Sequence, residues 1–160
     1  MTREKFIQMA EAHKDMVYRL AFSYTKNPAY AEDITQNVLL ALFTTSKEFD
    51  SDEHIKNWLV RTTINECKQL WRSAWNKTVS IDAYCRQLSF DDPHYEDLFL
   101  AIMKLDKKYR IVIALFYYEG YSIHEIAEIL KIPDATVGTR LRRARLLLKK
   151  WLKEDDENDK

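Results

Sequence analysis

Hydrophobic residues recur at intervals of three and four along most of the chain, which is the spacing of an amphipathic helix. In the first half this pattern predicts three helices, at residues 6–24, 29–43 and 54–72. Asn27-Pro28 breaks the pattern after the first helix, and a polar loop at residues 46–53 precedes the third. We expect these three helices to bury a common core.

The periodicity fades between residues 73 and 95, where polar residues alternate with isolated hydrophobes and a proline. We interpret this stretch as an extended, flexible linker. Helical spacing returns near Glu96 and predicts one short helix at 98–105 and another at 109–118, before a break at Gly120. The predicted fold is therefore all-α, with two small helical domains at 1–72 and 96–153, the linker 73–95 between them, and an acidic tail at 154–160.

The second domain carries the sequence signs of a helix-turn-helix motif. Ser122 and Glu125 have the spacing of a capping box, in which each side chain accepts a hydrogen bond from the other residue's amide. Lys131-Ile132-Pro133 is predicted as the turn, and Asp134 as the N-cap of a longer second helix. The expected inner face of that helix consists of Val137, Leu141, Ala144 and Leu148.

Positive charge is concentrated on this second helix. Residues 140–153 contain seven basic side chains and no acidic one, whereas the whole chain has 25 of each sign. Arginine near the start of such a helix can pair with guanine in the major groove, and cations further along can neutralise phosphates. The outward positions that we assign to DNA are Thr136, Thr139, Arg140, Arg142, Arg143 and Arg145. A solvated charged face and a membrane-surface helix are the alternatives, and the capping box, turn and inner face favour DNA binding.

Composition restricts the class of protein. Two glycines and three prolines favour long helices, and no apolar run reaches the ~18–20 residues that span a bilayer. Scattered charges near the amino terminus do not resemble a signal peptide. Cys67 and Cys85 lack CxxC spacing, and the histidines form no ligand or nucleophile pattern. We expect a cytoplasmic protein that is no enzyme and has no metal, cofactor or small-molecule substrate.

Two blocks of the sequence resemble a known family. The segment LDKKYRIVIALFYYEGYSIHEIAEILKIPDATVGTRLRRARLLLKK is similar to region 4 of the extracytoplasmic-function sigma factors, in the sigma-70 family. YRLAFSYTKNPAYAEDITQNVLLALF resembles region 2.1–2.2, and IKNWLVRTTINECKQLWR resembles region 2.3–2.4. The resemblance implies a factor that binds core RNA polymerase and directs it to promoter DNA. A stand-alone helix-turn-helix regulator is the alternative, against which the first domain argues.

The resemblance implies roles for residues of the first domain. The family's AED-x-x-Q pattern, which binds the clamp helices of the large catalytic subunit of polymerase, is present here as Ala31, Glu32, Asp33 and Gln36. A polar stripe on the third helix matches the surface that opens and holds the minus-ten element, and it consists of Arg61, Asn65, Lys68 and Arg72. The loop at 49–53 corresponds to the family's pocket for a flipped base. Trp58 lies on the inner stripe, where packing in the core is expected.

In the second domain, Thr139, Arg142 and Arg143 match positions that read the minus-thirty-five element in the family, and Arg140 matches a backbone contact. Two residues of the helix-turn-helix motif depart from the family pattern. Gly138 replaces a basic residue and costs the helix roughly 1 kcal/mol relative to alanine. Lys131 replaces the glycine of the turn and adds strain where a positive φ is needed.

Proteins of this family are commonly held inactive by an anti-sigma factor, which is often anchored in the membrane and covers the polymerase-binding surfaces. The resemblance therefore implies such a partner for this chain as well. Its expected contacts are the exposed apolar positions of both domains. The linker is expected to let the two domains rearrange between the inhibited and the polymerase-bound states.

Overall fold

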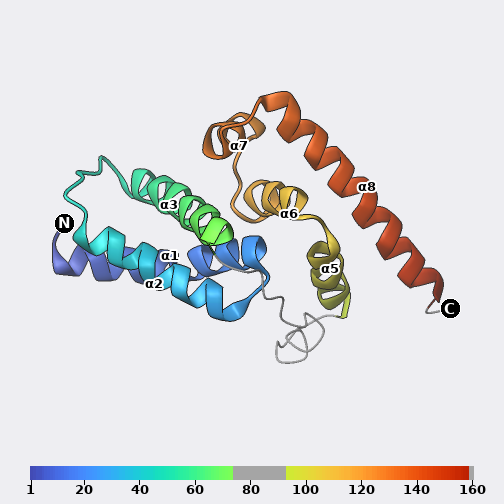
Figure 1. Cartoon of the computed structure of the whole chain (residues 1–160), viewed down its shortest axis with the longest axis horizontal. Coiled ribbons are helices and arrows are strands. Elements are labelled where there is room, and N and C mark those ends of the chain that lie inside the picture. The colour runs from blue at the N-terminus through green and yellow to red at the C-terminus, as the bar shows by residue number, and fades with distance from the viewer. Residues whose placement is uncertain (74–92, 159–160) are drawn as a thin grey trace. The chain divides into compact units, whose positions relative to one another are not determined.

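The computed structural model describes residues 1–73 and 93–158, and the chain divides into two compact units, Met1–Lys77 and Thr78–Lys160 (Figure 1). Throughout these described residues the regular elements are helices. Most of the predicted linker, residues 74–92, lies outside the described residues, as do the last two residues of the predicted acidic tail.

The first unit contains α1 (Arg3–Thr25), α2 (Pro28–Thr44) and α3 (Asp52–Ser73), and each helix packs against the other two. The predicted break between the first two helices begins at Lys26, which has a left-handed conformation with φ of 53°. The side chain of Asn27 then caps α2 by accepting hydrogen bonds from the amides of Ala29 and Tyr30. Pro28 suits the first turn because an amide there would have no partner within the helix.

The three helices of the first unit enclose an apolar core. Its largest fully buried side chains are Val17, Leu20, Val38, Leu42, Leu59, Val60 and Ile64. They recur at helical spacing on the inner faces of α1, α2 and α3, as the sequence pattern predicts. The opposite faces of α2 and α3 remain exposed to solvent and carry the predicted site residues of this unit.

The second unit begins with α5 (Pro93–Lys104), three residues before the start predicted at Glu96. The helix predicted at 109–118 begins at α6 (Lys107–Ile113) and changes to the π-helical segment η1 (Ala114–Tyr118). After α7 (Ile123–Leu130), α8 (Asp134–Asn158) runs along α7, α6 and α5 (Figure 1). Its backbone remains helical through most of the segment predicted as an acidic tail.

The helix-turn-helix motif is formed by α7, the turn and α8. The predicted capping box is present, with the Glu125 amide 3.1 Å from the Ser122 hydroxyl and the Ser122 amide 3.0 Å from the Glu125 carboxylate. Lys131 lies in the turn with φ of 58°, so the position does need the positive φ that glycine adopts most readily. The prediction that Asp134 is the N-cap is wrong by one residue, because Pro133 provides the carbonyl that accepts the first helical bonds.

The core of the second unit includes three of the four inner positions predicted for α8. Val137, Leu141 and Ala144 have no exposed surface, whereas Leu148 is half-buried. Arg110 is buried as well, and its Nη1 donates to the carbonyl oxygen of Leu105 at 2.6 Å. Burial lowers the pKa of Arg110 to about 10, so the guanidinium stays charged at neutral pH.

Candidate nucleic-acid interface

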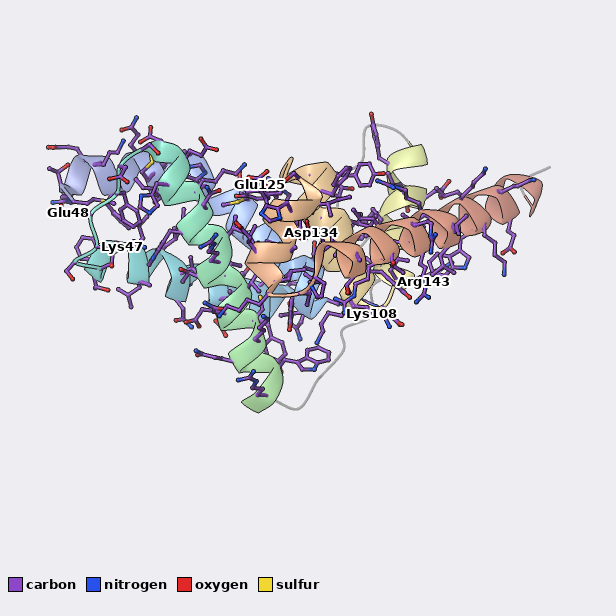
Figure 2. The ribbon with its side chains drawn as sticks, turned by 90° about the horizontal axis from the view of Figure 1, so that it is seen from above. Lys47, Glu48, Lys108, Glu125, Asp134 and Arg143 are labelled. Carbon is purple, nitrogen blue, oxygen red and sulfur yellow. The ribbon has the colours of Figure 1, made fainter. Side chains whose placement is uncertain are left out.

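The outer face of α8 and the start of α6 form a shallow hollow. Four of the predicted DNA-binding residues line it, and they are Thr136, Thr139, Arg140 and Arg143. Lys108 and Tyr109 of α6 and Ala135 complete the lining. The labelled side chains of Lys108 and Arg143 lie near each other in Figure 2. The structure therefore brings together residues from two helices that are about 30 positions apart in the chain.

The hollow is electropositive. Its three cations are Lys108, Arg140 and Arg143, and the lining contains no carboxylate. Within residues 1–73 and 93–158, none of these cations forms a salt bridge. Unpaired ammonium and guanidinium groups beside hydroxyl groups can bind phosphate oxygens and the edges of bases. This surface therefore has the chemistry to bind nucleic acid.

Two predicted members of the DNA-binding set lie outside this hollow. Arg142 is exposed, and Arg145 is held against the π-helical segment. The Nε of Arg145 donates to the hydroxyl of Tyr117, and its guanidinium lies 5.4 Å from the ring centres of both Phe116 and Tyr117. A DNA contact of Arg145 stays a prediction, because the structure does not group this residue with Arg143.

Arg145 instead borders a second hollow, which is almost entirely apolar. Its lining comes from α5, α6, η1 and α8 and consists of Leu98, Ile102, Ile113, Tyr117, Tyr118, Arg145 and Leu148. An apolar hollow with one bordering cation is suited to a protein partner rather than to the charged backbone of DNA.

The polar stripe predicted on α3 is present and accessible. Arg61, Asn65 and Arg72 are exposed and Lys68 is half-exposed, along roughly 16 Å of the helix. In the described part of the chain these four side chains have no hydrogen-bond or salt-bridge partner. They are therefore available to bind a strand of nucleic acid.

The polar face predicted on α2 is also exposed, at Glu32, Asp33 and Gln36. The same face continues into two apolar side chains that the sequence reasoning did not assign, because Leu40 and Phe43 follow Gln36 at intervals of four and three. They are about 60% exposed, and the Phe43 ring meets the Phe6 ring edge-on at 5.1 Å between centres. This face of α2 therefore combines acidic, amide and apolar groups.

The loop between α2 and α3 gathers aromatic rings. Phe49 lies edge-on to the half-buried Trp58, with 5.6 Å between ring centres, and also contacts His54 at 5.2 Å. Two acidic residues of the loop have partners of their own, since Asp52 forms a salt bridge with Lys5 and the Asp50 carboxylate lies 3.8 Å from His54 Nδ1. Trp58 thus packs against the loop and is only half-buried, so it is not one of the fully buried core residues that the sequence pattern predicted.

A histidine on α7 contacts a carboxylate on each helix of the helix-turn-helix motif, and the contact with α8 joins the two helices. The ring of His124 on α7 lies 3.1 Å from Asp134 at the start of α8, and 3.2 Å from Glu128. The hydrogen bond and charge of Asp134, together with the charge of Glu128, raise the pKa of His124. Protonated His124 therefore links α7 to α8 across the turn.

Two kinds of feature are absent from the described residues. They contain no group of three or more His, Cys, Asp or Glu side chains placed to hold a metal ion. Among the helices of residues 1–73 and 93–158, none has the length and apolar character needed to cross a membrane.

Family models match both units. The model described as Sigma-70 region 2 matches residues 9–77, and the one described as Sigma-70, region 4 matches residues 95–148. The chain is 32% identical to RNA polymerase sigma factor SigV of Bacillus subtilis over 97% of this chain and 95% of that protein. It is 30% identical to ECF RNA polymerase sigma factor SigW of the same organism, over 95% and 91%.

Solved structures resemble the fold. The sigma factor RpoE, solved in complex with the anti-sigma factor NepR from Bartonella quintana, matches with a TM-score of 0.72 and 25% identity, over 94% of this chain and 98% of that one. CnrH, solved in complex with the cytosolic domain of CnrY, matches with a TM-score of 0.68 and 25% identity, over 96% and 91%.

Proposed function

This chain belongs to the sigma-70 family as an extracytoplasmic-function RNA polymerase sigma factor, and from that premise we propose how its residues recognise a promoter. Such a factor binds core polymerase and directs it to start transcription at particular promoters. We assign residues 1–72 to region 2 and 96–153 to region 4, and we assign the two promoter elements to separate surfaces of these two parts.

The minus-thirty-five element binds in the electropositive hollow of the second unit. The observation that carries this assignment is the convergence of Thr136, Thr139, Arg140 and Arg143 on one hollow without a carboxylate. An α-helix of this kind fits the major groove, where arginine pairs bidentately with guanine. Arg143 and Thr139 read bases in this proposal, and Arg140 binds the backbone. Arg142, which is exposed beside them, stays a predicted contact.

The minus-ten element binds to the stripe on α3. Arg61, Asn65, Lys68 and Arg72 offer three cations and an amide along one exposed face, which suits the phosphates and base edges of a single strand. Core polymerase binds the exposed face of α2 at Glu32, Asp33 and Gln36. RNA synthesis belongs to the polymerase, so this chain supplies recognition and no catalysis, and it acts in the cytoplasm together with that enzyme.

An anti-sigma factor regulates the protein in this proposal. One solved relative is bound to an anti-sigma factor and another to the cytosolic domain of a partner protein. This chain offers two apolar surfaces for such a partner, which are Leu40 with Phe43 on α2 and the apolar hollow of the second unit. A partner that covers the first of these surfaces would compete with polymerase on α2. Anchoring of the partner in a membrane stays a prediction from the family resemblance.

Footprinting of the holoenzyme tests this division of roles. Core polymerase with this chain should protect both elements of a promoter selected by that holoenzyme, and permanganate should detect an open minus-ten region. Arg143→Ala should remove the upstream protection, whereas Arg61→Ala should keep it and reduce opening. The assignment would be contradicted if Arg61→Ala removed the upstream protection and Arg143→Ala did not.

A further inference from the structure

The electropositive hollow includes a cation that lies outside the helix-turn-helix motif. Lys108 belongs to α6, more than ten residues before the capping box, and it lines the hollow together with Arg140 and Arg143 (Figure 2). Its side chain is exposed, and in the described residues it has no salt-bridge partner. The charge of Lys108 is therefore available on the same surface that we assign to the minus-thirty-five element.

An aromatic ring holds this cation in place. The Nζ of Lys108 lies 5.2 Å from the centre of the Tyr109 ring, within the range of a cation–π interaction. Tyr109 is half-buried and also lines the hollow, so it is fixed by the fold and restricts the flexible lysine side chain. A restricted ammonium loses less conformational entropy when it binds a phosphate.

We propose that Lys108 binds a backbone phosphate of the upstream promoter DNA, beside the bases that Arg143 and Thr139 reach, and that Tyr109 positions it. The inference rests on the proposed function of this hollow. An ammonium is a compact point charge with no geometry for base discrimination, so its contact is with the backbone and independent of sequence. The DNA-binding surface of this protein thus extends from the helix-turn-helix motif onto α6.

The salt dependence of binding measures this contact directly. Each neutralised phosphate adds about 0.9 to the slope of log K against log salt. Lys108→Ala should therefore lower the slope by about 0.9, so that between about 50 and about 200 mM salt the wild type loses about 3.5-fold more affinity than the variant. Lys108→Arg should keep the wild-type slope because it keeps the charge.

The experiment uses holoenzyme made from bacterial core polymerase and the full chain. A duplex pool with randomised upstream positions is enriched by this holoenzyme, and affinity for the enriched duplex is then titrated over salt for each variant. Lys104→Ala is the matched control, because Lys104 is an exposed lysine of the same unit that does not line the hollow. Thermal unfolding verifies that each variant is folded.

The expected result is a lower slope for Lys108→Ala, with equal weakening on all enriched sequences, and an unchanged slope for Lys104→Ala. Tyr109→Phe should keep the slope because it keeps the ring face. If Arg143→Ala abolishes the sequence preference but Lys108→Ala leaves the slope unchanged, the phosphate contact of Lys108 is refuted and the proposed function stands. If core polymerase with this chain enriches no sequence over core polymerase alone, the phosphate contact of Lys108 and the proposed function are both refuted.

Discussion

Replacing Lys131 by glycine should stabilise the second unit. Lys131 has φ of 58°, and a residue with a Cβ pays about 1–2 kcal/mol in this left-handed conformation. Glycine avoids that strain but adds about 0.4–1 kcal/mol of unfolded-chain entropy. The Lys131 side chain is exposed, and the hydrogen bond from its amide to the carbonyl of Ala127 is kept in the variant. The net gain is therefore about 0.5–1 kcal/mol in the free energy of unfolding.

The assay is thermal unfolding of the full chain followed by circular dichroism or calorimetry. For a unit of this size the gain corresponds to a rise of about 4 °C in the Tm of the second unit. Lys149→Gly is the matched control, because Lys149 is an exposed lysine within α8 where glycine should cost about 1 kcal/mol. The reasoning is refuted if Lys131→Gly leaves Tm unchanged or lowers it while Lys149→Gly behaves as expected.

Three further changes should alter stability in defined ways. Gly138→Ala should raise the free energy of unfolding by about 1 kcal/mol in denaturant titration, because Gly138 is helical and a Cβ there meets open space; a loss would contradict this. His124→Gln should lower Tm at pH 6 and leave it nearly unchanged at pH 9. Asp134 is the main cause of the raised pKa of His124, so protonated His124 stabilises the folded second unit. This stabilisation is complete below the ordinary pKa of histidine and disappears as pH rises through the pKa of His124 in the folded state. Equal losses of Tm at both pH values would refute the link between His124 and Asp134. Arg110→Met should cost about 1–3 kcal/mol in denaturant titration, because it leaves the buried Leu105 carbonyl without its donor; a neutral result would mean that water replaces it.

Signals that are local in the chain predicted local structure well. The break at Asn27-Pro28 and the capping box of Ser122 and Glu125 appear as expected, because each is completed by residues within three positions. The sequence raised a positive φ at Lys131 only as a condition, from the glycine that the family has in this turn, and the structure shows that the condition is met. Helix ends that depend on hydrogen bonds between near neighbours in the chain can therefore be predicted without knowledge of the tertiary packing.

Features that depend on tertiary packing could not be predicted. The spacing within α8 gives no sign that Arg145 lies against Tyr117, because that contact also requires the π-helical segment η1. Helical periodicity predicted residues 109–118 as a single helix, since α and π segments have nearly the same apolar pattern. Lys108 was missed for the same reason, as only the packing of α6 on α8 brings it to Arg143.

In vitro transcription tests the central claim most directly. Bacterial core polymerase is supplied with this chain and a DNA fragment whose upstream region was enriched by this chain in the presence of core polymerase. The account predicts a discrete transcript that requires the chain, is lost with Arg143→Ala and is kept with Lys104→Ala. A chain that binds the fragment but neither binds core polymerase nor produces a transcript would contradict the account and identify a stand-alone regulator.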